Sequence, residues 1–326
     1  MHDTADLIAE AYGLGPGPWT LTPVTRGALG RIWKLTGADG TARAVKELLF
    51  GCDDKDVERE ASLRLAAERL GIASPRLFAN RHGAHVTRVP TAAGVSPVKL
   101  YDWIDGSPAD ISEPGILDWF GRTMGLLHRA GEGAVEAPDR WYERCPEAGD
   151  WKDLHEKATA AGVPWADELG RFIGTSAVEL ARWVTPSDAG DRVTSHLDLQ
   201  PQNVLVGPSG PVLLDWDNAG PVSAGREFAQ ALYVWAGGNR ADPAAARRLA
   251  RAYRRAGGPA TVHGPESFAM LFATSLNYIH VQAAAAVDPE LSPEQREFAN
   301  GQVAARLSEV PDPAAVSRLA AAVRDA

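Results

Sequence analysis

The residues best suited to chemistry in this chain are concentrated in one segment, 195–217, which reads SHLDLQPQNVLVGPSGPVLLDWD. Asp198 lies in a polar loop, Asn203 follows five residues later, and Asp215 ends an apolar run. A carboxylate can orient a hydroxyl group and accept its proton, and carboxylate and amide oxygens are ligands that Mg²⁺ accepts. Phosphoryl transfer from ATP requires both functions. The segment therefore predicts Asp198 as a base, with Asn203 and Asp215 as magnesium ligands.

The stretch between the two expected ligands is predicted to bring them together. Two short strands, 203–206 and 211–215, are separated by a Gly-Pro-Ser-Gly turn. A hairpin places its two ends side by side, so Asn203 and Asp215 can hold one ion. His196 is expected to pack and hydrogen-bond so that it fixes the loop.

With the motifs HLDLQPQN and LLDWD, the chain resembles the aminoglycoside phosphotransferase family of kinase-like phosphotransferases. In that family the catalytic loop reads HxDxxxxN, and the metal strand reads apolar-apolar-Asp-Trp-acid. The resemblance implies Asp198 as the catalytic base and Asn203 and Asp215 as magnesium ligands. Asp217 matches the second acid of the metal strand and could hold metal, brace the loop or face the substrate.

Lys46 lies on the expected third strand, in ARAVKELL, where it is a lone cation among Ala44, Val45, Leu48 and Leu49. In the fold of this family, a lysine on that strand binds the α- and β-phosphates and a helix carboxylate holds it. The resemblance implies Glu60 as the carboxylate, because it precedes Pro75 by fifteen residues, as in the family's E…P pattern. Glu58 is the alternative, on a different face of the same helix.

The loop at residues 25–31, TRGALGR, joins the first two expected strands. Gly27 and Gly30 would let backbone N–H groups approach phosphates closely. The loop departs from the GxGxxG pattern of protein kinases. The family often has Ser or Asn late in this loop, where this chain has Gly30.

The adenine site is expected at the linker KLYDWIDG, in which Gly106 aligns with the family's hinge glycine. This alignment implies that the Asp102 carbonyl accepts from the adenine amino group. It also implies that the Ile104 N–H donates to the ring.

A later segment, Arg226-Glu227-Phe228-Ala229, resembles the family's Asp-Leu-Ala segment. The aspartate usually braces the catalytic loop, and Glu227 stands in its place here. Glu227 and Asp217 are also candidates for contact with ammonium groups of a substrate.

The elements that must position these residues change character along the chain. Strands are expected at 19–26, 31–36, 42–50, 84–89 and 97–104, with one helix over 55–70 that Asp53 and Asp54 can cap. Helical periodicity dominates afterwards, at 115–130, 166–184, 226–236, 243–256, 265–286, 292–308 and 312–325.

The fold class expected is α+β, a protein-kinase-like two-lobe fold. It has a small antiparallel-sheet lobe with one helix and a larger, mainly helical lobe. The predicted boundaries are 1–100 for the nucleotide-binding lobe, 101–106 for the hinge and 107–326 for the catalytic and substrate-binding lobe.

Composition narrows the choice of partners. A net charge of −9 over 326 residues, with no basic helix, argues against nucleic-acid binding and permits a cationic ligand. No apolar run is long enough to cross a bilayer, and residues 1–10 lack a signal-peptide pattern, so a cytoplasmic protein without membrane contact is expected. Cys52 and Cys145 lack the spacing of a metal site or a disulfide framework.

These observations predict an enzyme that transfers the γ-phosphate of ATP, with Mg²⁺, to a hydroxyl of a small molecule; GTP is an alternative donor. An antibiotic is favoured as the acceptor, either an aminoglycoside or another cationic, hydroxyl-rich compound. A metabolic kinase acting on an amino sugar, choline-like amine or homoserine is one alternative, and an inactive nucleotide-binding scaffold is another. A monomer or weak homodimer is expected.

Overall fold

The chain divides into two compact units in a computed structural model that describes residues 2–27, 30–91 and 94–324. Unit 1 comprises residues 1–110 and 196–220, and unit 2 comprises residues 111–195 and 221–326. The predicted boundaries differ from this division, because residues 196–220 belong to the same compact unit as the N-terminal sheet. The assignment of a nucleotide-binding lobe, a hinge and a catalytic lobe stays a prediction.

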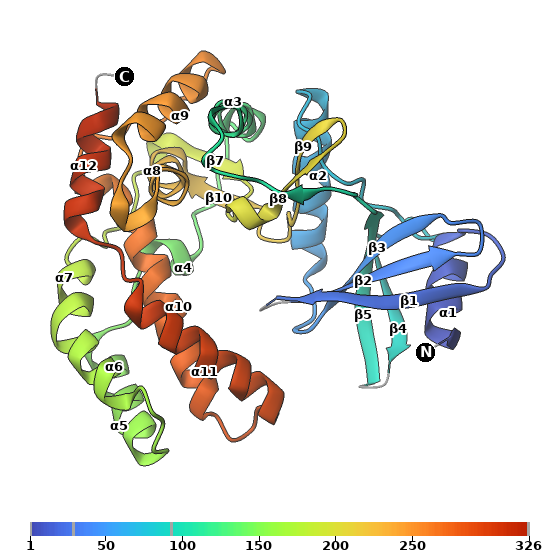
Figure 1. Ribbon diagram of the computed structural model, residues 1–326, viewed down its shortest axis with the longest axis horizontal. Helices are drawn as coiled ribbons and strands as arrows, with labels where there is room; N and C mark the ends of the chain where they lie inside the picture. The colour runs from blue at the N-terminus through green and yellow to red at the C-terminus, as the bar shows by residue number, and fades with distance from the viewer. Residues whose placement is uncertain (1, 28–29, 92–93, 325–326) are drawn as a thin grey trace. The chain divides into compact units, whose positions relative to one another are not determined.

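Unit 1 is built on a five-stranded antiparallel sheet in the order β1-β2-β3-β5-β4 (Figure 1). The strands are β1 (Trp19–Arg26), β2 (Gly30–Gly37), β3 (Ala42–Leu48), β4 (Val86–Thr91) and β5 (Gly94–Asp102). Helix α1 (His2–Tyr12) packs against this sheet, and its side chains Ala5, Ile8, Ala9 and Tyr12 are buried there with Trp19, Leu35, Val45, Val89, Val98 and Leu100. Apolar residues at helical spacing thus form the core of unit 1.

The two faces of the sheet differ in chemistry. Val45 on β3 is paired with Leu100 on β5, and the next pair along the strands is Lys46 with Lys99. Successive side chains of a strand point to opposite faces, so the lysines lie on the face opposite the apolar core. Two opposed lysines therefore lie on the face of the central strands that is turned away from the apolar core.

Helix α2 (Asp54–Arg69) supplies the partners for that charged face. Its first turn is capped by Asp53, whose carboxylate accepts from the Lys55 N–H at 2.8 Å, and it ends before Gly71, which has a φ of +78°. Helix α2 carries two buried charged side chains, Glu60 and Arg64, and Glu60 contacts Lys99 of the sheet.

A second, three-stranded sheet in unit 1 carries the predicted hairpin. Strands β8 (Val204–Gly207) and β9 (Gly210–Leu213) are antiparallel, with β6 (Ser107–Pro108) on the outer side of β8. Gly210, with a φ of +105°, makes the tight turn between them. The hairpin was predicted correctly from its turn residues.

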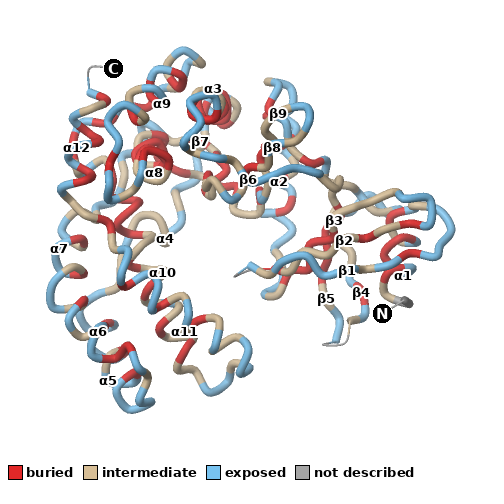
Figure 2. The backbone as a smooth tube through the Cα atoms, in the orientation of Figure 1, coloured by how far each residue is buried: buried red, intermediate tan, exposed pale blue. Residues whose placement is uncertain are grey.

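Unit 2 is mainly helical, as expected. Its helices are α3 (Pro114–Ala130), α4 (Arg140–Glu143), α5 (Ala148–Ala160), α6 (Ala166–Phe172), α7 (Val178–Ala181), α8 (Ala224–Trp235), α9 (Pro243–Arg255), α10 (Ala269–Val287), α11 (Pro293–Ser308) and α12 (Pro313–Val323). Strands β7 (Arg192–Ser195) and β10 (Gly220–Ser223) pair with each other in a two-stranded sheet. Buried segments run through α3, α8, α9 and α10 (Figure 2). Phe120 of α3 stacks on Trp235 of α8 with ring centroids 3.9 Å apart.

Several elements differ from the sequence prediction. Helices α1, α4 and α5 were not predicted. Because of α1, unit 1 contains two helices, α1 and α2, rather than the one expected. The single helix expected over 166–184 is α6 and α7 joined by a π-helical turn, Ile173–Ala177. None of the described helices is long and apolar enough to cross a membrane.

Candidate active site

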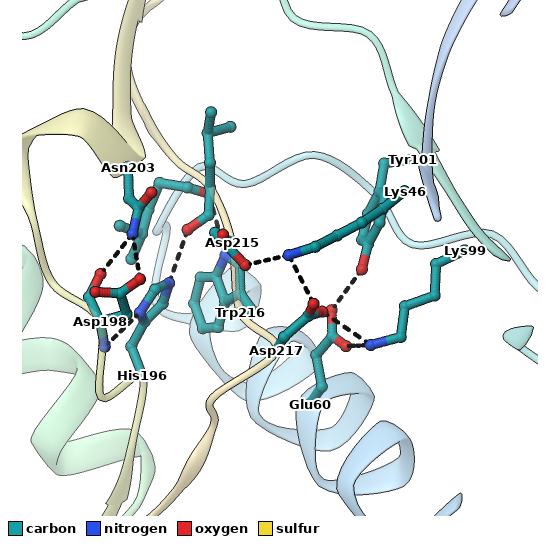
Figure 3. Close-up of polar contacts among 12 residues, drawn as sticks. Lys46, Glu60, Lys99, Tyr101, His196, Asp198, Asn203, Asp215, Trp216 and Asp217 are labelled. Atoms are coloured by element: carbon teal, nitrogen blue, oxygen red, sulfur yellow. Dashed lines mark hydrogen bonds and ion pairs between the residues drawn. The ribbon is translucent and has the colours of Figure 1, made fainter. Parts of the chain in front are cut away.

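The predicted catalytic loop is a tightly bonded turn in unit 1 that begins at His196 and ends in the 3₁₀ turn Pro201–Asn203 (Figure 3). Two backbone bonds close it, from Gln200 N–H to the Asp198 carbonyl at 2.9 Å and from Asn203 N–H to the Gln200 carbonyl at 3.0 Å. Leu197 has a φ of +64°, in the left-handed region that L-residues rarely adopt. Such strain is characteristic of functional loops, where surrounding contacts maintain it.

His196 fixes this loop, as expected from the sequence. It is fully buried; its Nδ1 accepts from the Asp198 N–H at 3.3 Å, and its Nε2 lies 2.8 Å from the Leu214 carbonyl oxygen. Because Nδ1 accepts, the ring proton is on Nε2, which donates to Leu214. The ring also contacts Trp216 edge-on, with centroids 4.9 Å apart. His196 thus ties the loop to the end of the β8–β9 hairpin.

Asp198 and Asn203 are hydrogen-bonded to each other within this loop. The Asn203 amide nitrogen donates to the Asp198 carboxylate at 2.8 Å and to the Asp198 carbonyl at 2.9 Å. These two acceptors fix the orientation of the amide, since only its NH₂ group can donate. The Asn203 side-chain oxygen is consequently left to act as an acceptor or a metal ligand.

The environment of Asp198 raises the pKa of its carboxyl group above the ordinary value. Burial and the neighbouring negative charge of Asp215 raise the pKa of Asp198, and the Asn203 hydrogen bond and the Lys46 charge lower it. The net result is a pKa raised to about 6. A carboxyl group with a pKa in this range can accept a proton near neutral pH and release it again.

In the magnesium-free protein, the Asp198 carboxyl is expected to titrate near pH 6, so its ability to accept a proton is lost as the pH falls below that value. Carbon-13 NMR of the aspartate carboxyl groups would measure this pKa. Asp215→Asn should lower it, because the substitution removes a nearby negative charge, whereas Asp167→Asn on α6 should leave it unchanged. A pKa of Asp198 at or below the ordinary value of 3.8 would contradict the expectation.

Asp215 follows β9 and reaches the same loop from the other end of the hairpin. The Leu214 N–H donates to the Asn203 carbonyl at 2.8 Å, which places the predicted ligands on adjacent backbone. Asp215 has a φ of +57°, and its side chain is 40% exposed. Backbone geometry therefore directs this carboxylate outward rather than into the core.

The donor set fits magnesium better than an all-protein metal cage. No cluster of three or more His, Cys, Asp and Glu side chains arranged for a metal occurs in the described part of the chain. Mg²⁺ usually takes one or two protein ligands and completes its shell with waters and phosphate oxygens. Asn203 and Asp215, one amide oxygen and one carboxylate, match that requirement.

The structure corrects the predicted partner of Lys46. The Lys46 ammonium contacts Asp215 Oδ1 at 2.5 Å and Asp217 Oδ2 at 2.6 Å (Figure 3). Glu60 contacts Lys99 instead, at 2.5 Å. The predicted Lys46–Glu60 pair is therefore wrong as a direct contact, because a second lysine lies between the two residues.

Glu60 rather than Glu58 is nevertheless the helix carboxylate of this site. Glu60 is fully buried and Glu58 is exposed. The Tyr101 hydroxyl donates to Glu60 at 3.0 Å, and Arg64 lies 3.8 Å from it on the same helix. Both oxygens of the Glu60 carboxylate thus have close partners.

Sequence reasoning missed Lys99 and Tyr101, both on β5. Lys99 is 3% exposed and contacts Asp217 as well as Glu60. A signal existed, because Lys99 is a single cation in the apolar segment PVKLY, much as Lys46 follows the apolar pair Ala44-Val45. Interpreting that signal required knowing that β3 and β5 are neighbours.

The glycine loop is described only in part, because Ala28 and Leu29 lie outside the described residues. The Gly27 N–H donates to the Gly30 carbonyl at 2.9 Å. A Cβ atom on Gly30 would lie 2.8 Å from the Glu47 carbonyl oxygen and 3.2 Å from the Lys46 Cε. Gly30 therefore permits close packing over the Lys46 side chain, and contact of this loop with phosphate stays a prediction.

The predicted hinge at residues 101–106 contacts two neighbouring segments of unit 1 through Asp102 and Trp103. The Asp102 N–H donates to the Arg76 carbonyl at 3.2 Å, and the Asp102 carboxylate accepts from the Arg76 N–H at 3.3 Å. The Lys34 ammonium lies over the Trp103 ring, 4.4 Å from its centroid. Ile104 follows at intermediate exposure. The expected adenine contacts of Asp102 and Ile104 stay a prediction.

Of the two acids proposed for substrate binding, Glu227 is buried and Asp217 is largely enclosed, with a side chain that is 13% exposed. Asp217 has one oxygen on each lysine. Although burial raises its pKa, the Lys46 and Lys99 charges lower the pKa of Asp217 to about 2. The Glu227 carboxylate in unit 2 accepts from His128 Nε2 at 2.7 Å, and His128 Nδ1 lies 2.7 Å from the Tyr253 hydroxyl. These contacts are structural, and substrate contact by either acid stays a prediction.

The antiparallel sheet with its buried lysines, the Asp198–Asn203 loop and the β8–β9 hairpin that leads to Asp215 are the arrangement of a kinase-like phosphotransferase. Residues 20–265 match the phosphotransferase enzyme family, and the chain belongs to that family. The family recognition, the α+β kinase-like fold class and the prediction of a phosphotransferase are confirmed.

Three known proteins illustrate the similarity. The trifolitoxin immunity protein of Rhizobium leguminosarum bv. trifolii is 34% identical over 111 residues, which cover 32% of this chain and only 37% of that protein. Spectinomycin phosphotransferase APH(9)-Ia, solved with ADP and spectinomycin, is 14% identical with a TM-score of 0.61, over 98% of this chain and 96% of that one. A choline/ethanolamine kinase family protein from Mesorhizobium loti is 17% identical with a TM-score of 0.52, over 99% of each chain. At these identities the two structures support the fold alone.

Proposed function

We propose that the chain is an ATP- and magnesium-dependent O-phosphotransferase that acts on a hydroxyl group of a small, cationic molecule. The observation that carries this proposal is the constellation in unit 1. Asp198 is hydrogen-bonded to Asn203. Asp215 directly follows Leu214, whose N–H is bonded to the Asn203 carbonyl, and its carboxylate contacts the Lys46 ammonium. A base, two oxygen ligands and a phosphate-binding cation are the parts that phosphoryl transfer requires.

Each residue has a distinct task in this proposal. Asp198 orients the attacking hydroxyl and accepts its proton, for which its raised pKa is suited. Lys46 neutralises charge on the α- and β-phosphates. Asn203 and Asp215 would hold the magnesium ion, which would neutralise charge on the phosphates.

The nucleotide is proposed to bind through backbone groups of the linker and the glycine loop. Asp102 and Ile104 would pair with the adenine ring, and Gly27 and Gly30 would admit phosphates near the backbone. Backbone recognition of the ring also leaves GTP as an alternative donor. Dependence on a nucleotide donor makes a cytoplasmic location part of the proposal.

An antibiotic is favoured as the acceptor, and a metabolic small-molecule kinase is the alternative. The net charge of −9 favours a cationic acceptor. Similarity to a spectinomycin phosphotransferase and to a toxin immunity protein supports an antibiotic role. Similarity to a choline/ethanolamine kinase family protein supports the metabolic alternative. The inactive-scaffold alternative is disfavoured, because Lys46, Asp198, Asn203 and Asp215 are all present.

A phosphate-transfer screen tests the proposal. The purified chain, with ATP or GTP and magnesium, is expected to phosphorylate at least one member of a panel of aminoglycosides, macrolides, peptide antibiotics, amino sugars, choline-like amines and homoserine. Susceptibility of cells expressing the chain separates the two roles. Unchanged susceptibility to every antibiotic class would contradict the resistance role, and nucleotide binding without transfer to any acceptor would support the scaffold.

A further inference from the structure

The site contains two buried lysines where one was expected. Lys46 and Lys99 are directly opposite each other on β3 and β5, with exposures of 8% and 3%. Like charges opposite each other on neighbouring strands destabilise a sheet, and buried ammonium groups require counterions. The pair is therefore tolerated only because carboxylates reach both residues.

Asp217 is the carboxylate that the two lysines share. Its Oδ2 lies 2.6 Å from Lys46, and its Oδ1 lies 2.9 Å from Lys99. The Asp217 side chain is 13% exposed, against 40% for Asp215. Of the two acids on Lys46, Asp217 is thus the enclosed one, and Asp215 is the one that has access to solvent and a metal ion.

Glu60 is fully engaged elsewhere. Its Oε2 lies 2.5 Å from Lys99 and its Oε1 accepts from Tyr101 at 3.0 Å, so the helix carboxylate reaches Lys46 only through Lys99 and Asp217 (Figure 3). The order of contacts is Glu60, Lys99, Asp217, Lys46, and each link is a charged contact of less than 3 Å.

We infer that Asp217, and not Glu60, is the carboxylate that holds Lys46 for the nucleotide phosphates, and that Lys99 is a positioning residue that fixes Asp217. Lys99 acts through Asp217 and links it to helix α2. This inference rests on the proposed function, because it assigns roles toward a bound nucleotide.

Binding of magnesium with AMP-PNP, a non-hydrolysable ATP analogue, measured by calorimetry, tests the inference. Asp217→Asn and Lys99→Met are each expected to weaken binding about tenfold, a size typical for coupled charged neighbours. The double variant should bind about as well as Asp217→Asn alone, because Lys99 acts through Asp217. Glu60→Gln should change the affinity less than about threefold, since it does not contact Lys46.

Matched controls exist on helix α2, where Lys55→Met and Glu58→Gln change exposed residues of the same types. Thermal unfolding shows whether each variant is folded. Lys99→Arg keeps the charge and should bind within about threefold of the unsubstituted chain. If Lys99→Met unfolds, Lys99→Gln, which also removes the charge, replaces it with the same expected loss.

Three results would overturn the inference: normal binding by folded Lys99→Met, additive losses in the double variant, or a loss in Glu60→Gln equal to that in Asp217→Asn. If the unsubstituted chain does not bind AMP-PNP with magnesium, the proposed function fails instead. The two failures are therefore distinguishable.

Discussion

Replacement of Asp198 by alanine is expected to lower kcat by about 10²- to 10⁴-fold, the contribution typical of a general base. ATP affinity should stay close to that of the unsubstituted chain, because Asp198 is directed at the acceptor hydroxyl in the proposed mechanism. The loss should therefore fall on kcat and kcat/KM together rather than on the KM for ATP. Steady-state kinetics with the best acceptor from the screen would measure both.

Asp198→Asn is the companion variant, because it keeps the size of the side chain and removes only its basicity. Asp167→Ala, at an exposed position on α6, controls for loss of an acid elsewhere. Turnover like that of the unsubstituted chain in either Asp198 variant would refute the assignment of the base.

Replacement of Asp215 by alanine is expected to abolish the magnesium dependence of nucleotide binding. Asp215 is the more exposed of the two acids on Lys46, and it is the only carboxylate in the proposed pair of metal ligands. Asn203 alone supplies one neutral oxygen, which is a weak ligand for a hard dication. Calorimetry with ATP, with and without magnesium, would measure the difference.

The matched control is Asp54→Ala, at an exposed position in the first turn of α2. Its nucleotide binding should respond to magnesium like that of the unsubstituted chain. A magnesium response that persists in Asp215→Ala would contradict the role of Asp215 as a ligand.

The catalytic loop and its hairpin could be predicted from sequence because their contacts are local. Asp198 and Asn203 are five residues apart, and the turn at Gly210 fixes the register that returns the chain to Asp215. A turn of this kind is determined by a few adjacent residues, so it can be predicted from sequence. The roles assigned to these residues still depend on the kinetic and binding measurements above.

The partners of Lys46 could not be predicted in the same way. Whether Glu60 reaches Lys46 or Lys99 depends on the pairing of β3 with β5 and on how α2 lies against both. Those are long-range properties, and two lysines in similar apolar strands compete for the same carboxylate. The family resemblance implied a Lys46–Glu60 pair, but it gave no indication that Lys99 would take Glu60 as its own partner.

The unpredicted helices have different causes. Helix α1 has a clear apolar face, Ala5, Ile8, Ala9 and Tyr12, so its signal was available at helical spacing. The π-helical turn after Phe172 has no comparable signal, because periodicity continues through it into α7. Glu227 was singled out from its resemblance to the family's aspartate, and its observed partner, His128, is 99 residues away and could not be inferred from the sequence.

The buried chain of charges from Glu60 to Lys46 also constrains how this site can evolve. Loss of one member leaves its neighbour charged and enclosed, which costs more than exchange of a whole pair for apolar residues. Lys99 and Glu60 should therefore have been acquired together and should disappear together among descendants of this sequence. A lineage that loses both would need another partner to hold Asp217 in place.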